Sequence, residues 1–231
     1  MFSVMFEVHP RPEQWDAYLA NARLLRPELE RVDGFIDNVR YRSLTRDGWL
    51  LSLSGWRDEK SVVRWRTQMK HHMVQQRGRS EIMLDYHLRV GEIVSDTQPP
   101  PGYTLQQQRL DETEVGAGTA IAMVDARRSS AWTNGANAQD IARMLGLRDD
   151  MPGLVSWDVL DAVLAPGDVI LFMCLKDQAA AEACVRTMAL PEGARLRTVR
   201  VVRDYGMYDR REAPQYHPEA PSRSRHTPPA S

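Results

Sequence analysis

The chain contains few cysteines and no long apolar run. Only Cys174 and Cys184 occur among its 231 residues, and their spacing fits neither a disulfide framework nor a metal-binding motif. No stretch reaches the roughly 18 consecutive apolar residues of a membrane span, and the first residues lack the basic start and apolar core of a signal peptide. We therefore expect buried thiols in a reducing compartment, no membrane span, and a cytoplasmic protein.

An excess of charge of one sign is also lacking. The 30 basic side chains nearly balance the 31 acidic ones, which leaves a formal net charge of −1. Because the arginines are scattered rather than gathered into a basic stripe, we expect no nucleic-acid partner. The motifs GxGxxG, P-loop, GxSxG, HExxH and CxxC do not occur. Their absence removes support for nucleotide-dependent redox chemistry, phosphoryl transfer and serine hydrolysis.

The apolar patterning predicts an α+β fold of two ferredoxin-like units. Segments with strand and helix periodicity follow one another in the order β-α-β-β-α-β, with Asp58 as the cap of the second helix. They lie at about 2–9, 12–31, 35–44, 49–56, 59–79 and 85–94. The same order returns between residues 118 and 207, so the chain is predicted to contain two βαββαβ repeats in tandem.

Identities at a constant offset of 119 residues support an internal duplication. The pairs are Gly34 with Gly153, Gly48 with Gly167, Asp58 with Asp177, Met69 with Met188, Asp85 with Asp204, and Tyr86 with Tyr205. The last two pairs favour a structural role for both residues, since both copies carry them. We predict domains at residues 1–95 and 118–207, a polar linker at 96–117 and a proline-rich tail at 208–231 that is partly disordered.

One predicted helix of the first repeat carries two adjacent histidines. At 3.6 residues per turn a single stripe contains Val62, Trp65, Met69, His72 and Gln76. The neighbouring stripe, which contains His71, is wholly polar, so we expect His72 to face the sheet and His71 to face water. At the same offset Trp65 corresponds to Cys184 and His72 to Pro191. Only the first repeat then has a polar inward residue, which favours a single functional pocket there.

An inward His72 has three interpretations. It is a core histidine with satisfied nitrogens, a general base or hydrogen-bond donor in a cleft between helix and sheet, or an axial ligand of haem iron. Arg79, at the helix end, either caps the helix or holds an anionic group. Strand alternation places Asn38 and Tyr41 on opposite faces and does not decide which face lines a cavity. The candidate substrate-binding residues are Met69, Gln76, Asn38, Tyr41 and Trp56.

The stretch WRDEKSVVRW at 56–65, the paired histidines, Gln76, Arg79 and the dipeptide ending at Tyr86 resemble the antibiotic biosynthesis monooxygenase family of dimeric α/β-barrel proteins. Residues 1–95 resemble one complete domain and residues 118–207 a more divergent copy. The resemblance implies two ferredoxin-like units whose sheets close a barrel, here within one chain. It leaves open whether two tandem chains pair further into a homodimer.

The resemblance implies a small molecule bound between helix and sheet. We expect a monooxygenase of an aromatic, phenolic or polycyclic substrate that needs no cofactor, in which Trp65 shapes the pocket, His72 moves a proton and Arg79 holds an oxyanion. One alternative is a haem-binding protein or haem enzyme with His72 on iron, although the spacing from Trp65 to His72 is short for haem degraders. Another is a barrel that binds a small ligand without catalysis.

Overall fold

The computed structural model describes residues 1–128 and 136–214, without the side chains of Lys70 and His72. The elements, in chain order, are β1 (Phe2–Pro10), η1 (Pro12–Gln14), α1 (Trp15–Glu30), β2 (Phe35–Ser43), β3 (Leu50–Trp56), α2 (Glu59–Arg66), α3 (Met69–Arg77), η2 (Gly78–Ile82), β4 (Met83–Asp96), β5 (Ala120–Arg127), α4 (Ala138–Met144), β6 (Leu154–Ala162), β7 (Asp168–Leu175), α5 (Gln178–Thr187) and β8 (Arg195–Gly206). The predicted order of strands and helices therefore occurs twice.

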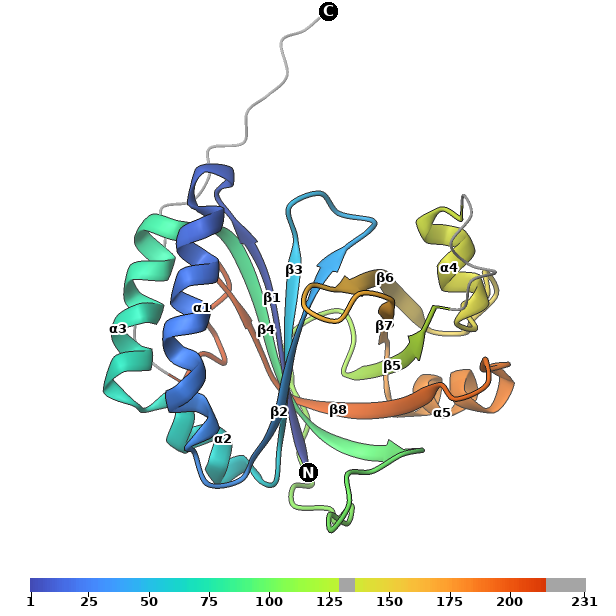
Figure 1. Cartoon of the computed structure of the whole chain (residues 1–231). Helices are drawn as coiled ribbons and strands as arrows, with labels where there is room; N and C mark the ends of the chain where they lie inside the picture. The colour runs from blue at the N-terminus through green and yellow to red at the C-terminus, as the bar shows by residue number, and fades with distance from the viewer. Residues whose placement is uncertain (129–135, 215–231) are drawn as a thin grey trace, which may run out of the picture.

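The strands close into one antiparallel barrel. Their order around it is β1-β3-β2-β6-β7-β5-β8-β4. The two units join where β2 pairs with β6 and where β4 pairs with β8. Figure 1 shows α1, α2 and α3 on one side of the barrel and α4 and α5 on the other. The fold class is thus confirmed: two tandem ferredoxin-like units form the barrel within a single chain.

Gly34 and Gly153 hold the same turn in the two units. Both have left-handed backbones, with φ of 86° and 73°. The carbonyl of Gly34 accepts from the backbone N–H of Arg57, and that of Gly153 from Lys176, each at 2.8 Å. Each turn packs against the start of the following helix, α2 or α5, which Asp58 or Asp177 caps through a backbone N–H. The duplication therefore extends to individual turn and cap contacts.

The offset of 119 does not hold through to the last strand of each unit. Phe2 at the start of β1 pairs with Trp56 on β3 and with Glu92 on β4. Its counterpart Ala120 at the start of β5 pairs with Leu175 on β7 and with Arg200 on β8. Trp56 and Leu175 are 119 apart, but Glu92 and Arg200 are only 108 apart. The first unit is longer by those eleven residues, because α3 and η2 take the place of a short connection. The predicted pairings of Asp85 with Asp204, Tyr86 with Tyr205 and His72 with Pro191 are wrong for this reason.

The apolar core has a layer inside the barrel and a layer under each group of helices. Met5, Leu53, Ile121, Phe172 and Val201 are among the side chains that fill the barrel. Separate clusters lie between the sheet and α1–α3 and between the sheet and α4–α5. In the described ranges, none of the helices has the length and apolar run that crossing a membrane needs.

The segments outside the two units also pack on the body. In the predicted linker, Tyr103 and Leu105 pack against the apolar cluster inside the barrel. After β8 the chain turns back toward the start of β4, where the hydroxyl of Tyr208 donates to the carbonyl of Leu84 at 3.3 Å. The rest of the predicted tail, from residue 215 onward, lies outside the described residues.

Candidate functional site

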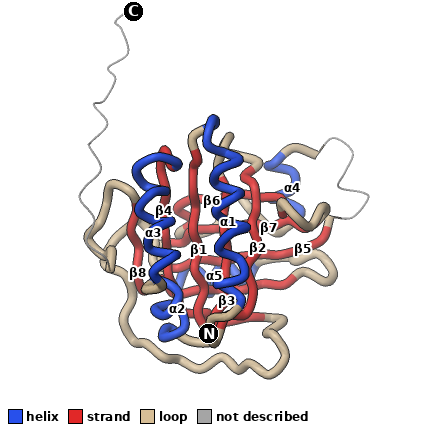
Figure 2. Tube along the Cα trace, turned by 60° about the vertical axis from the view of Figure 1, so that its left-hand side comes forward, coloured by secondary structure: helices blue, strands red, loops and turns tan. Residues whose placement is uncertain are grey.

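A cavity of about 210 Å³ lies between the helices of the first unit and the outer face of the sheet. Its roof comes from α1, α2, α3 and η2, with α1 and α3 running side by side in Figure 2. Its floor comes from β1, β2, β3 and β4 and from the end of β8. Because β8 belongs to the second unit and pairs with β4, both units contribute to this cavity. The cavity is therefore the candidate for the substrate pocket that was predicted between helix and sheet.

Trp65 and His71 form one part of the cavity wall. Their rings stack with centroids 4.2 Å apart and planes inclined by 17°. His71 Nδ1 lies 3.0 Å from the carbonyl oxygen of Trp65. A carbonyl oxygen only accepts hydrogen bonds, so a neutral His71 carries its proton on Nδ1 and the basic lone pair on Nε2. The contact therefore fixes both the orientation and the tautomer of the imidazole.

The predicted stripe holds for Val62 and Trp65, which line the cavity, but is wrong for Met69 and Gln76, because the helix is broken. The α2 helix ends at Arg66, Gln68 has an extended backbone with ψ of 133°, and α3 begins at Met69. The break resets the helical phase, so His71 lines the cavity instead of facing water. Met69 is 78% exposed and Gln76 is exposed as well, so neither lines the cavity. The side chain of His72 lies outside the described part of the structure.

Two of the other predicted residues line the cavity and two do not. Asn38 and Arg79 line it, and the Asn38 amide donates to Ser52 Oγ at 3.0 Å and to the carbonyl of Leu53 at 3.1 Å. Tyr41 points into the barrel, where its hydroxyl donates to Asp125 at 3.2 Å. Trp56 is fully buried in the core under α2 and is not part of the lining. Asn38 and Tyr41 lie on opposite faces of β2, as strand alternation predicted, and the Asn38 face is the one that lines the cavity.

Arginine dominates the charged part of the lining. Among the described lining residues no aspartate or glutamate occurs. The lining arginines come from α1, β2, α2, η2, β8 and the segment after β8: Arg26, Arg40, Arg66, Arg79, Arg203 and Arg210. The remaining wall is largely apolar, with Val4, Leu25 and Leu88 among its side chains. A cavity of this kind suits an apolar molecule that carries negative charge.

Two guanidinium groups meet at the hydroxyl of Tyr86. Arg79 donates to this oxygen at 3.3 Å and Arg210 at 2.5 Å. Burial raises the pKa of Tyr86, and the two arginines only partly offset this, so the phenol is neutral at physiological pH. Burial, with a smaller contribution from Arg210, lowers the pKa of Arg79. Burial also raises the pKa of the nearby Tyr205 to about 12.

Sequence reasoning missed Tyr86, Tyr205 and Arg210 as cavity residues. Tyr86 and Tyr205 had been assigned structural roles because of an apparent equivalence that the register contradicts. Tyr86 lies two residues from Leu88 on β4, and Tyr205 lies two residues from Arg203 on β8, so each pair shares one face of the sheet. This spacing could have identified both tyrosines as cavity residues if the outer face of the sheet had been known. Arg210 lies after the last strand, and no periodicity of the sequence places it.

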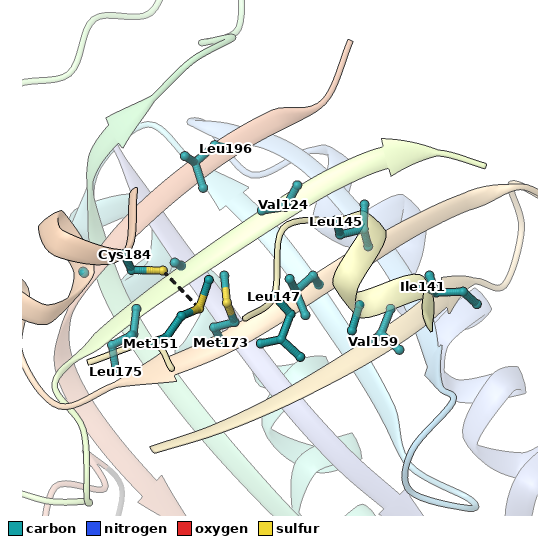
Figure 3. Close-up of a cluster of buried hydrophobic side chains, with 14 of the residues drawn as sticks. Val124, Ile141, Leu145, Leu147, Met151, Val159, Met173, Leu175, Cys184 and Leu196 are labelled. Atoms are coloured by element: carbon teal, nitrogen blue, oxygen red, sulfur yellow. Dashed lines mark hydrogen bonds between the residues drawn. The ribbon is translucent and has the colours of Figure 1, made fainter. Parts of the chain in front are cut away.

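The equivalent space in the second unit is filled by apolar side chains. At the offset that holds for β2 and β3, the cavity residues Asn38, Arg40, Ser52 and Ser54 correspond to Trp157, Val159, Leu171 and Met173. These four residues belong to or pack against the core under α4 and α5. Figure 3 shows Cys184, the counterpart of Trp65, against Met151, with Sγ and Sδ 3.7 Å apart. The second unit thus has a packed core where the first has a cavity.

Clusters of side chains that could bind a metal ion are lacking in the described part of the chain. No group of three or more His, Cys, Asp or Glu side chains converges there as a metal site would require. The imidazole that lines the cavity in the described part of the chain is that of His71, which Trp65 holds in place.

Similarity to known proteins is extensive along the chain. The family model described as antibiotic biosynthesis monooxygenase matches residues 1–77. The chain is 46% identical over 225 residues to the jasmonate monooxygenase ABM of Pyricularia oryzae, and the match covers 95% of this chain and 100% of that protein. This match therefore includes both units and the connection between them.

Solved structures show more distant likenesses. A crystal structure of an antibiotic biosynthesis monooxygenase is 14% identical and covers 41% of this chain and 100% of that chain, with a TM-score of 0.37. A crystal structure of an anthrone oxidase-like protein is 16% identical and covers 89% of this chain and 92% of that chain, with a TM-score of 0.31. The fold described above stands on the strand pairing of this chain itself.

Proposed function

The chain belongs to the antibiotic biosynthesis monooxygenase family, and from this premise we propose that it is a monooxygenase of jasmonate or a closely related small carboxylic acid. The substrate binds in the cavity between α1–α3 and the sheet. The observation that carries the proposal is the charge of this cavity, since its described lining combines an apolar wall with arginines and without carboxylates. The 46% identity to a jasmonate monooxygenase along its whole length supports the same substrate class.

An aromatic or polycyclic substrate, which the family resemblance implied, is the competing proposal. Cavities for drug-sized ligands usually measure about 300–1,000 Å³. The cavity here, at about 210 Å³, is smaller and favours a compact molecule over a polycyclic one. Jasmonate, a carboxylic acid with one five-membered ring and short side chains, is compact and also carries the charge that the arginines complement.

Within the cavity, His71 takes the proton-handling role that the sequence suggested for His72. Its Nε2 holds the basic lone pair because Nδ1 donates to the carbonyl of Trp65. Trp65 stacks on the imidazole and shapes the apolar wall beside it. In monooxygenation a C–H bond of the substrate becomes C–OH, one oxygen atom of O₂ enters that bond, and the other leaves as water. Two electrons and two protons balance the reaction, and we assign the electrons to an external hydride donor.

Oxygen transfer to jasmonate tests the proposal. Purified protein is incubated with jasmonate in oxygen-18 gas, with and without a reduced nicotinamide, and the product is examined by mass spectrometry. We expect a product with one labelled oxygen atom. His71→Ala should lower kcat/KM about 100-fold, the scale of a lost general base. Met73→Ala is the matched control, because Met73 lies on the same helix and is 64% exposed, and it should change little.

Other outcomes identify the alternatives. Tight binding of jasmonate without any product would make the chain a ligand-binding barrel. Product formation only after addition of haemin, with an absorption shift that saturates at one equivalent, would make it a haem enzyme and return attention to His72. Oxygen uptake with phenolic substrates but not with jasmonate would support the competing proposal of an aromatic substrate.

A further inference from the structure

Three hydrogen-bond donors converge at the corner of the cavity formed by η2, β4 and the segment after β8. Arg79 and Arg210 both donate to the hydroxyl oxygen of Tyr86. A phenol oxygen has two lone pairs and one O–H. With both lone pairs occupied by guanidinium groups, Tyr86 still has its own O–H to donate, and the described residues provide no acceptor for it. Two guanidinium groups and one phenol O–H are thus side by side at this corner, and these are the donors with which proteins bind a carboxylate.

The segment that carries Arg210 is fixed on both sides of it. Before Arg210, the backbone N–H of Met207 donates to the carbonyl of Tyr86 at 3.1 Å. After it, the carboxylate of Glu212 accepts from the hydroxyl of Thr113 and from the backbone N–H of Asp204, both at 2.6 Å. Arg210 also lies over the ring of Tyr205, with its guanidinium carbon 5.6 Å from the ring centroid. The guanidinium is therefore positioned by ordered backbone.

We propose that Arg210, together with Arg79 and Tyr86, binds the carboxylate of the substrate, so that a residue from beyond the second unit determines specificity in the cavity of the first. This assignment rests on the proposed substrate class. It also orients the substrate: His71 lies eight residues before Arg79, a separation of about 12 Å at the helical rise of 1.5 Å per residue. The oxygenated carbon, near Trp65 and His71, is then at the end of the molecule remote from the carboxylate.

Paired acids and neutral analogues test the anchor. Affinities of the full-length protein for jasmonate and methyl jasmonate, and for octanoate and octanol, are measured by calorimetry. We expect the wild-type protein to prefer each acid. Arg210→Met and Arg79→Met should weaken binding of the acids about 10- to 100-fold, the scale of a lost charge-assisted hydrogen bond, and leave the neutral analogues unchanged. Arg210→Lys, which keeps the charge, should retain part of the preference.

Arg211→Met is the matched control, because Arg211 is exposed and pairs with Asp209, and it should leave all four affinities unchanged. Equal weakening of acid and neutral ligand in Arg210→Met would indicate a structural role and overturn the proposal, as would unchanged binding of the acids. The octanoate pair keeps the two proposals distinguishable. If jasmonate is oxygenated but Arg210→Met has no effect, the proposed carboxylate site is wrong. If the preference for octanoate over octanol disappears in Arg210→Met but jasmonate gives no product, the proposed substrate is wrong and the carboxylate site stands.

Discussion

Tyrosines beneath the helices of the first unit show what burial does to a single ionisable side chain. Tyr205 is 8% exposed, and its pKa is raised to about 12 because burial disfavours the phenolate. The pKa values of Tyr18 and Tyr86 are raised for the same principal reason, with nearby arginines opposing the shift. These phenols fold as neutral groups, and ionising them in the unfolded chain favours unfolding.

Replacement of Tyr205 by phenylalanine should make the protein less sensitive to alkali. An unfolded tyrosine ionises near pH 10, whereas folded Tyr205 keeps its proton up to about pH 12. Between these values the folded state binds more protons, so the free energy of unfolding falls as pH rises, by about 1.4 kcal/mol per pH unit for this group. Urea unfolding at several pH values between 9 and about 11.5 measures the slope. Tyr205→Phe should reduce it by roughly that amount, and a slope equal to that of the wild type would contradict the burial argument.

Single residues were predictable where one strand or one helix decides their position. Local periodicity placed Asn38 opposite Tyr41 on one strand and Arg79 at a helix end, although it did not decide which face of the strand meets the cavity. Asn38 and Arg79 both line the cavity. Tyr41 lies on the opposite face of β2, inside the barrel, as strand alternation predicted. Arg210 could not be found in this way, because its place depends on where the chain runs after the barrel has closed.

At the scale of elements, the break between α2 and α3 determines which histidine reaches the cavity. Thr67 Oγ1 donates to the carbonyls of Val63 and Arg64 at 2.9 and 3.2 Å, a contact that competes with continued helix. A threonine in a helical pattern usually continues the helix, so the sequence offered little warning of the break. The inserted helix α3 becomes recognisable when the two repeats are aligned by their strand pairing in the barrel. That pairing cannot be read from the sequence.

The turns before β2 and between β6 and β7 allow a comparison of two glycines with similar backbones. Gly34 and Gly167 have φ of 86° and 95°. A Cβ at Gly34 would lie 2.0 Å from Ser61 Oγ, whereas nothing lies within 4 Å of a Cβ at Gly167. Gly167→Ala should therefore cost only the left-handed backbone, about 1–2 kcal/mol. Gly34→Ala should cost about 2–5 kcal/mol, since the collision with the start of α2 adds to it. Chemical denaturation compares the two variants, and equal losses would show that the contact with α2 is unimportant.

At the scale of the whole molecule, charged side chains inside the barrel tie the two units together. Arg89 on β4 contacts Glu7 on β1 at 2.6 Å and Asp204 on β8 at 3.2 Å. Arg46 contacts Glu7 at 2.7 Å and Asp158 on β6 at 2.8 Å. Closure of the barrel within one chain was implied by the family resemblance. The sequence could not predict the links from Arg89 to Asp204 and from Arg46 to Asp158, because each joins one unit to the other and forms only when the barrel closes.

Removal of Arg89 should reverse the response of stability to acid. Burial alone would raise the pKa of Glu7, but Arg89, Arg46 and His87 overcome it and lower the pKa below 4.5. In the wild type this stabilisation is therefore present above pH 4.5 and is lost as the pH falls through the lowered pKa. Arg89→Met leaves two buried carboxylates short of a partner and should cost about 3–5 kcal/mol at neutral pH. Burial then dominates at Glu7, its pKa rises above 4.5, and the variant should gain stability as the pH falls from 7 toward 5. Urea unfolding across this range tests the sign of the response. Arg127→Met is the control, because the ion pair of Arg127 with Asp168 is exposed, and it should stay within about 0.5 kcal/mol of the wild type. If Arg89→Met lost stability on acidification in parallel with the wild type, Glu7 would not depend on Arg89, and the network would not be what couples the two halves of the barrel.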